Sequence, residues 1–150
     1  MKYKKEELHK LLPHRDDMLL IDDVELVDDG ETRRAIAHYT VRGDEFFLRG
    51  HFPDFPVVPG VILCEMMVQS CCVFFADENQ TEDVTTFLTS LNNVKFRSPV
   101  RPGDTARFEC TMTRQNRIFT FAEGKTFIGD KLAAAAEFSF ALAPTEKVKG

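Results

Sequence analysis

Hydrophobic and polar positions alternate along most of the chain, with one exception near its middle. Alternation with a period of two is typical of half-buried β-strands, and it covers six segments. They are residues 18–27, 32–40, 86–96, 105–115, 117–128 and 132–143. Residues 133–136 are all alanine and favour a helix, but the alternation over residues 138–143 favours a strand for the last segment. Asp28, Asp29 and Gly30 lie between the first two segments and predict a hairpin turn.

The exception is residues 61–76, an almost unbroken apolar run whose main polar members are Glu65 and Gln69. The run contains no Gly or Pro and is apolar nearly all round, so it predicts a helix that is buried on most sides. A short helix is also predicted over residues 4–12, ended by Pro13. One buried helix with a largely antiparallel sheet predicts an α+β fold, in a single domain over residues 1–150.

Composition and charge narrow the classes of function. Lys and Arg number 19 and Asp and Glu number 24, which gives a formal net charge of −5. This balance argues against a nucleic-acid-binding protein, which needs a basic face. Fourteen residues are Phe, against two Tyr and no Trp. We expect most of these rings in the core and some of them along a channel for an apolar chain.

The cysteines are Cys64, Cys71, Cys72 and Cys110, and their spacing fits neither a metal site nor a disulfide framework. The first ten residues are charged rather than apolar, so we expect no signal peptide. The longest wholly apolar stretch is too short to span a bilayer. We therefore expect reduced, buried thiols in a cytoplasmic protein. Cys64 lies among apolar residues with no evident activating group, which argues against a cysteine nucleophile.

The loop before the long helix carries the first candidate for chemistry. Residues 50–60 contain three prolines within seven positions, which restrict the backbone and make the loop rigid without secondary structure. His51 is the histidine held in this segment. A histidine on a stiff loop that leads into a helix with a carboxylate is typical of a general base with an acid partner.

Glu65 and Gln69 are four residues apart and share one face of the predicted helix. They could form a satisfied polar pair at a subunit contact. Alternatively, burial favours the protonated form of Glu65, which could then donate a proton near neutral pH. Gly60 lies at the start of the helix, where free backbone N–H groups can form an oxyanion hole. A base, an acid and an oxyanion donor together indicate proton abstraction next to a carbonyl, followed by loss of a β-substituent. Spacing does not show that these groups meet.

These residues, with three further segments, resemble the 3-hydroxyacyl-acyl carrier protein dehydratases of bacterial fatty acid synthesis. The matching segments are residues 12–15, 19–22, 50–53, 56, 59–61, 65, 69 and 94–104, in order along nearly the whole chain. Glu65 resembles the dehydratases without isomerase activity, because the related isomerising enzyme has Asp at this position. His14 and Arg15 belong to the first motif, and we interpret them as a structural turn and subunit contact.

The resemblance implies a hot-dog fold, a curved antiparallel sheet wrapped around one long helix. It also implies a homodimer with joined sheets and shared active sites, which in this family is often assembled further as a trimer of dimers. His51 would take the α-proton of a (3R)-3-hydroxyacyl thioester, and Glu65 of the partner subunit would help the 3-hydroxyl leave as water. Gly60 would hold the thioester oxygen, and Gln69 would orient Glu65 or the departing water. The product would be the trans-2-enoyl thioester.

The implied partner is an acyl carrier protein, which is acidic. An acidic chain needs a local basic patch to bind it, and Lys95, Arg97 and Arg101 cluster in the sequence. No metal or redox cofactor is expected, because dehydration is redox-neutral. Three alternatives remain open. They are a hot-dog acyl-thioester hydrolase, a dehydratase of a specialised polyketide or polyene pathway, and a non-catalytic acyl-thioester binding module.

Overall fold

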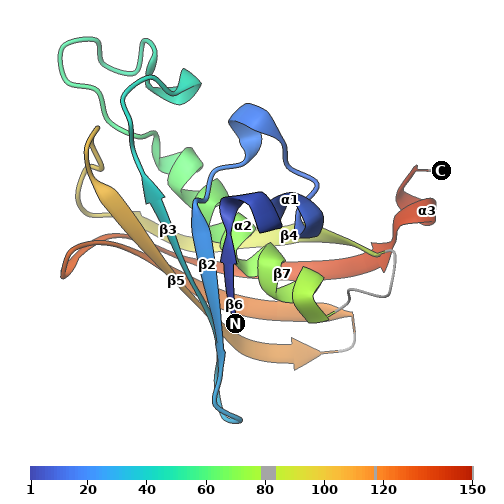
Figure 1. Ribbon diagram of the computed structural model, residues 1–150. Helices are drawn as coiled ribbons and strands as arrows, with labels where there is room; N and C mark the ends of the chain where they lie inside the picture. Colours follow the sequence, from blue (N-terminus) through green and yellow to red (C-terminus); the bar gives the residue numbers. More distant parts are fainter. Residues whose placement is uncertain (79–83, 117, 150) are drawn as a thin grey trace.

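The computed structural model describes residues 1–78, 84–116 and 118–149. Within these residues the chain forms one seven-stranded sheet whose neighbouring strands are all antiparallel (Figure 1). The strands are β1 (Lys2–Lys4), β2 (Asp23–Asp28), β3 (Arg33–Thr40), β4 (Val84–Phe96), β5 (Thr105–Asn116), β6 (Phe119–Ile128) and β7 (Lys131–Pro144). Their order in the sheet is β1-β2-β3-β5-β6-β7-β4. The helices are α1 (Lys5–Leu11), α2 (Gly60–Glu78) and α3 (Thr145–Lys149).

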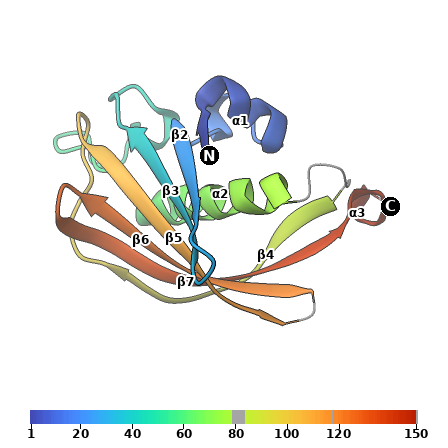
Figure 2. The same ribbon diagram turned by 60° about the horizontal axis from the view of Figure 1, so that its bottom comes forward.

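The sheet curves around α2, which lies across its concave face (Figure 2). Met66, Met67, Cys71 and Val73 of α2 are almost fully buried there, so the prediction of a buried helix is confirmed. The 18 residues from Gly60 to Asp77 are long and apolar enough to cross a membrane by composition, but 61 % of them are buried inside the domain. The helix is therefore the centre of the core. A curved antiparallel sheet around one helix is the hot-dog architecture that the resemblance implies.

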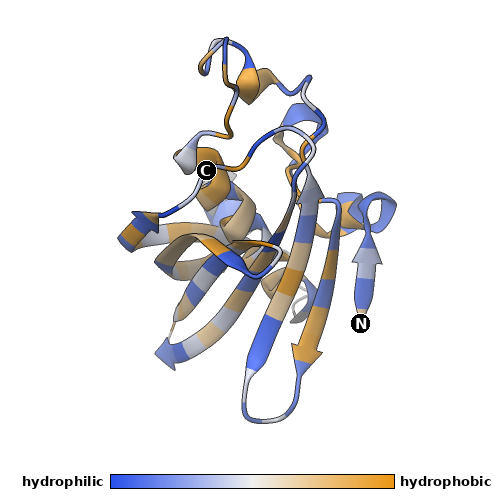
Figure 3. Cartoon of the chain, turned by 90° about the vertical axis from the view of Figure 1, so that its left-hand side faces the viewer, coloured by the Kyte–Doolittle hydropathy of each residue, from blue (hydrophilic) through white to orange (hydrophobic). Residues whose placement is uncertain are grey.

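The strands show the alternation that predicted them (Figure 3). In β5 the side chains of Ala106, Phe108 and Cys110 are buried, and the residues between them are half-buried. The last predicted strand is confirmed as β7, in spite of its alanines. The hairpin turn between β2 and β3 is also confirmed, with Gly30 at a φ of 89°.

The strand predicted over residues 18–27 is wrong in its first half. Asp16–Met18 is a 3-10 turn, and β2 begins only at Asp23. The reason is that Leu19, Leu20 and Ile21 are all buried in succession, which a strand with one solvent-facing side does not allow. β1, α3 and the 3-10 turn Phe46–Leu48 were not predicted, since segments this short show no period. Residues 79–83 of the polar connection and residue 117, the first of a predicted strand, lie outside the described residues.

Two features of the fold determine where a site can form. The loop over residues 41–59 joins β3 to α2 and lies beyond the N-terminal end of that helix (Figure 1). β4 is the last strand of the sheet and runs beside α2 along much of its length (Figure 2). The beginning of α2 and the end of β4 therefore lie near the loop that carries His51.

Candidate active site

A tight bend presents His51. The residue before it, Gly50, has a φ of 73° and the residue after it, Phe52, has a φ of 66°. A left-handed conformation costs a non-glycine residue about 1–2 kcal/mol, so the loop holds Phe52 in a strained geometry. The backbone N–H of His51 donates to the carbonyl of Leu48 at 3.1 Å. Strain that the surrounding contacts maintain is often found at functional sites.

The ring of His51 is also fixed. Its Nδ1 lies 2.9 Å from the backbone carbonyl oxygen of Val57. A carbonyl oxygen only accepts hydrogen bonds, so Nδ1 carries the proton and donates. In the neutral ring Nε2 is then left with its lone pair free, which is the state that a general base needs.

His51 lines a pocket of about 600 Å³ at the start of α2. The end of the loop and the beginning of α2 contribute Val57, Val58, Pro59, Gly60, Val61 and Leu63 to its lining. The end of β4 and the segment after it contribute Phe96, Arg97, Ser98, Pro99 and Val100. The N–H of Val58 donates to the carbonyl of Val100 at 2.8 Å, which ties these two segments together. The pocket is mostly apolar, with His51 and Arg97 as its titratable residues.

Gly60 is the first residue of α2 and lines the same pocket. The first N–H groups of a helix have no intrahelical acceptor, and the helix dipole favours negative charge there. A side chain at this position would meet the ring of Phe96, because a Cβ built on Gly60 would lie 2.6 Å from Cζ of that ring. Glycine at this position thus leaves room for the Phe96 ring beside the N-terminus of the helix. The structure therefore brings His51 and Gly60 together in one pocket, which the sequence spacing alone did not show.

Glu65 lies farther along α2 in a different set of contacts. Its Oε2 accepts a hydrogen bond of 3.0 Å from Nε2 of Gln69. Gln69 is fully buried; it also donates to the carbonyl of Met18 and accepts from the N–H of Leu20. The predicted Glu65–Gln69 pair is therefore present, and Gln69 is held from three sides. The carboxylate itself keeps 32 % of its side-chain surface exposed, so the expected burial of Glu65 is only partial in the single chain.

His14 is the residue whose position the sequence did not reveal. Its Nε2 lies 3.6 Å from Oε2 of Glu65, and its Nδ1 is buried with no hydrogen-bond partner among the described residues. Arg15, by contrast, donates to the backbone carbonyls of His9, Leu12 and His14, as expected for a structural turn. No periodicity places His14 next to a helix residue 51 positions later, and only the packing of the segment against α2 reveals it.

The single chain does not bring His51 and Glu65 into one pocket. Glu65 is five residues after Gly60, and five residues turn a helix by about 140° beyond one full turn. Glu65 is accordingly absent from the lining of the His51 pocket. The described part of one chain thus holds two partial sites, one with His51 and Gly60 and the other with Glu65, Gln69 and His14.

The predicted basic cluster is only partly at the site. Lys95, Arg97 and Arg101 are all exposed, but of these three residues Arg97 lines the His51 pocket. The backbone N–H of Arg97 donates to the carbonyl of Ala133, which fixes its backbone beside β7. Arg101 begins a turn that the carboxylate of Asp104 closes by accepting from its N–H.

The thiols lie mostly in the core, as the sequence predicts. All four cysteines are free, and Cys64, Cys71 and Cys110 are buried. Burial raises the pKa of Cys64, and burial with the nearby Glu65 carboxylate raises the pKa of Cys72 to about 12, so neither is an activated nucleophile. In residues 1–78, 84–116 and 118–149, His, Cys, Asp and Glu form no group of three that could hold a metal ion.

Comparison with known proteins identifies the family. A model of the FabA-like domain matches residues 12–137. The 3-hydroxyacyl-acyl carrier protein dehydratase FabZ of Clostridium kluyveri is 32 % identical over 140 residues, which cover 93 % of this chain and 96 % of that protein. The dehydratase FabZ of a Caulobacter species is 39 % identical over 145 residues, 95 % of this chain and 87 % of that protein.

Solved structures support the same fold. The dehydratase heterocomplex ApeI:P from Xenorhabdus doucetiae matches with a TM-score of 0.76 at 18 % identity, over 95 % of both chains. A mutant of the fluoroacetyl-CoA-specific thioesterase FlK matches with a TM-score of 0.67 at 15 % identity, over 81 % of this chain and 94 % of that one. At these identities the structures show the hot-dog fold alone. The family model and the similar sequences show more, and the chain belongs to the FabA-like family of 3-hydroxyacyl-acyl carrier protein dehydratases.

Proposed function

We propose that this protein dehydrates (3R)-3-hydroxyacyl thioesters on acyl carrier protein to trans-2-enoyl thioesters in bacterial fatty acid biosynthesis, as a hydro-lyase in the cytoplasm. The similar dehydratases support this reaction class. The observation that carries the proposal is His51, whose Nδ1 proton is held by the Val57 carbonyl beside the N-terminus of α2. That arrangement provides a base next to an oxyanion donor.

The elimination divides between three groups. Nε2 of His51 takes a proton from C2 of the acyl chain, and the electron pair of that C–H bond forms the C2–C3 double bond. The bond between C3 and its hydroxyl breaks, and Glu65 supplies the proton that lets the hydroxyl leave as water. The Gly60 N–H donates to the thioester oxygen as negative charge develops on it. Gln69 holds the Glu65 carboxylate in place. The reaction moves two protons, breaks the C3–O bond and forms the C2–C3 double bond without net oxidation or reduction, so we propose that it uses no metal and no redox cofactor.

His51 and Glu65 act together in this proposal only if a second copy of the chain completes the site. β4 supports such a homodimer because it is a 13-residue edge strand of the sheet. Large apolar side chains stay exposed along it, namely Phe87, Leu88, Leu91 and Phe96. A long exposed edge with apolar side chains is a template for pairing with another chain. We propose that the β4 strands of two copies pair there.

The register of that pairing would unite the two partial sites. Two copies of one strand related by a two-fold axis run antiparallel, so the end of one β4 lies beside the beginning of the other. The His51 pocket contains residues 96–100, at the end of β4. A second cavity of about 510 Å³ contains residues 84–86, at the beginning of β4, together with His14 and Cys72. His14 is the residue in contact with Glu65. The dimer would therefore join the His51 pocket of one copy to the Glu65 region of the other.

We also propose that Arg97 meets the acyl carrier protein or the phosphate of its phosphopantetheine. Arg97 is exposed and lines the pocket of the candidate base. Lys95 and Arg101 lie within four positions of it in the sequence and are exposed as well. A local positive patch at the pocket entrance would offset the net charge of −5 and attract an acidic carrier.

The test is to add a (3R)-3-hydroxyacyl thioester and follow the absorbance of the enoyl product. The wild-type protein should produce it, and His51→Ala and Glu65→Ala should each abolish it while keeping the native oligomer. A thiol reagent in the same assay detects hydrolysis. Release of thiol without enoyl product would show a hydrolase instead, and binding without turnover would show a binding module. Near-normal turnover by either variant would refute the assigned role.

A further inference from the structure

Glu45 is a buried charged residue that the proposed reaction does not use. It is 6 % exposed, and among the side chains described in residues 1–77, 84–116 and 118–147 it is the one Asp, Glu, Lys or Arg that is buried. It lies at the start of the loop that carries His51, five positions after the end of β3. Burying a carboxylate is costly unless it is hydrogen-bonded. The contacts of Glu45 therefore show what it stabilises.

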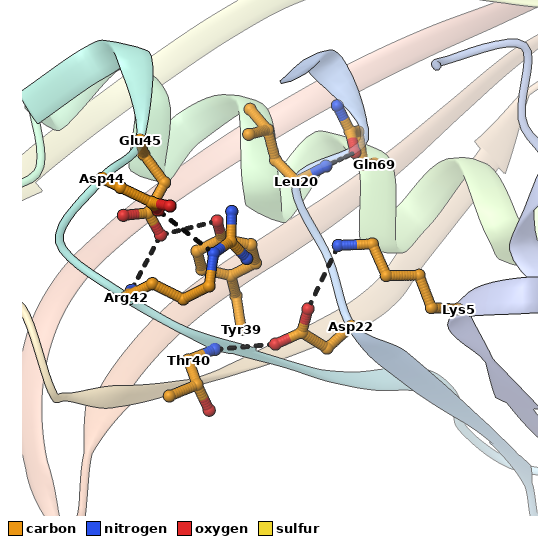
Figure 4. Close-up of polar contacts among 9 residues, drawn as sticks. All are labelled: Lys5, Leu20, Asp22, Tyr39, Thr40, Arg42, Asp44, Glu45 and Gln69. Atoms are coloured by element: carbon orange, nitrogen blue, oxygen red, sulfur yellow. Dashed lines mark hydrogen bonds and ion pairs between the residues drawn. The ribbon is translucent and has the colours of Figure 1, made fainter. Parts of the chain in front are cut away.

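Both oxygens of the Glu45 carboxylate accept hydrogen bonds, and Figure 4 shows those from Tyr39 and Arg42. Oε2 accepts from the hydroxyl of Tyr39 at 2.8 Å and from the N–H of Arg42 at 2.9 Å. Oε1 accepts from the N–H of Gly43 at 2.8 Å. Burial alone would raise the pKa of Glu45, but these donors hold it below its ordinary value, so the group is a carboxylate near neutral pH. It closes the turn by which the chain leaves the sheet.

Tyr39, which donates to the Glu45 carboxylate, is itself held rigidly at the end of β3. Tyr39 lies in β3 and is 2 % exposed, so its hydroxyl is fixed by the core. The next residue, Thr40, donates its N–H to Oδ2 of Asp22 at 2.8 Å, and Oδ1 of Asp22 lies 3.4 Å from Nζ of Lys5 (Figure 4). The end of β3 is thus held from both sides.

Backbone hydrogen bonds connect Glu45 to His51. The carbonyl of Glu45 accepts from the N–H of Leu48 at 3.1 Å, which forms the 3-10 turn Phe46–Leu48. The carbonyl of Leu48 accepts in turn from the N–H of His51 at 3.1 Å. The position of the His51 backbone is therefore defined by a short series of contacts that starts at the Glu45 carboxylate.

We infer that Glu45 is a positioning residue for His51, which holds the imidazole in the geometry that proton abstraction needs. The inference rests on the proposed role of His51 as the base. Glu45 touches no substrate in this scheme and acts through the loop. The 19-residue loop between β3 and α2 is attached at its beginning, where Val41 exchanges backbone hydrogen bonds with Gly103 and Asp104, and at its end, where Val58 donates to Val100. Glu45 provides a further attachment between these two, close to His51.

Glu45→Gln tests the inference, and Asp44→Asn is the matched control. The glutamine amide has one acceptor oxygen, so its NH₂ group must face a backbone N–H of Arg42 or Gly43, which disrupts the turn. Asp44 is the neighbouring residue, but its side chain is 80 % exposed. We expect Glu45→Gln to lower kcat about ten- to a hundred-fold, because small misplacements of a catalytic group have effects of this size. KM should change much less, and Asp44→Asn should change neither.

Two further measurements separate positioning from loss of fold. Nitrogen NMR of the His51 ring should show Nδ1 protonated in the wild-type protein and a mixture of tautomers in Glu45→Gln. Amide hydrogen exchange should accelerate over residues 46–58 and stay unchanged in β5 and β6. Tyr39→Phe removes one donor and should have a smaller effect in the same direction, which keeps the test valid if Glu45→Gln does not fold.

An unchanged His51 tautomer and unchanged kcat in folded Glu45→Gln would overturn the inference. Exchange that accelerates throughout the sheet would overturn it as well, since Glu45 would then be a general stability residue. The NMR and exchange measurements need no substrate. They therefore still decide the positioning role if the wild-type protein fails to dehydrate the thioester, which would refute the proposed function alone.

Discussion

Two glycine-to-alanine substitutions should separate activity from stability. Each places a new Cβ against a phenylalanine ring at nearly the same distance. A Cβ on Gly60 would lie 2.6 Å from Cζ of Phe96, and a Cβ on Gly124 would lie 2.7 Å from Cε2 of Phe138. Neither glycine has the left-handed backbone that alanine avoids. The difference between the two positions is whether the ring can move.

Phe96 is 52 % exposed on the edge strand, so its ring can turn away from the new methyl group of Gly60→Ala at little cost. Alanine also favours a helix over glycine by up to about 1 kcal/mol. We expect the free energy of unfolding of Gly60→Ala to stay within about 1 kcal/mol of wild type. For a chain of 150 residues that is about 3 °C in Tm.

Phe138 is 2 % exposed, and Gly124 also faces Sδ of the fully buried Met67 at 2.9 Å. Overpacking a core costs about 1–3 kcal/mol, and the lower unfolded-state entropy of alanine returns up to about 1 kcal/mol. We expect a net loss of about 1–2 kcal/mol for Gly124→Ala. The corresponding fall in Tm is about 3–6 °C.

Gly60→Ala should lose more activity than Gly124→Ala, although it should lose less stability. Gly60 and Phe96 both line the His51 pocket, so the new methyl group and the displaced ring should reduce kcat/KM about ten-fold or more. For Gly124→Ala, kcat/KM per folded molecule at 25 °C should equal that of the wild-type protein. Thermal melts by circular dichroism and the enoyl absorbance assay measure the two effects. A large fall in Tm for Gly60→Ala with unchanged kcat/KM would refute this reasoning, as would lost activity in stably folded Gly124→Ala.

Three further predictions follow from single contacts. His14→Asn should lower kcat no more than about five-fold. The 3.6 Å between Nε2 of His14 and Oε2 of Glu65 is too long for a hydrogen bond, and a part-exposed pair contributes about 1 kcal/mol at most. A loss of kcat equal to that of Glu65→Ala would instead make His14 a catalytic residue. The folded pKa of Glu45 is lowered, so its stabilising contribution is complete above its ordinary value of 4.5 and is lost as the pH falls through the folded value. Denaturant unfolding should accordingly show a steeper loss of stability in wild type than in Glu45→Gln as the pH falls below 4.5, and equal slopes would contradict this. Charge reversal of Arg97 and Arg101 should raise KM for carrier-bound substrate more than for a short thioester mimic, and equal effects on both substrates would exclude carrier contact.

Periodicity was sufficient to predict the main elements of this fold. Period-two alternation predicts the long strands because each has one face on the core, and the apolar run over residues 61–76 predicts α2 because the helix is buried on most sides. The strand prediction is wrong over residues 18–22, because Leu19, Leu20 and Ile21 are all buried and this segment follows a 3-10 turn instead of pairing as a strand. The short elements β1 and α3 gave no pattern at all.

The candidate site could be predicted only where residues are close in the chain. Glu65 and Gln69 lie one helical turn apart, so their pairing follows from spacing. His51 and Gly60 lie nine positions apart on one proline-restricted loop and were both candidates, but only the structure shows that they share a pocket. His14 reaches Glu65 across 51 positions through tertiary packing. In the sequence, Glu45 looks like any charged residue of an exposed loop. Its burial and its three hydrogen-bond donors become visible only in the structure.

The central claim is that His51 of one copy and Glu65 of another form each active site. Heterodimers of one His51→Ala chain and one Glu65→Ala chain, purified through two different tags, test it directly. In such a dimer one site lacks both residues and the other site has both. We predict about half of the wild-type enoyl formation per dimer. No recovery of activity would contradict this, because each site would lack one residue if His51 and Glu65 met within one chain.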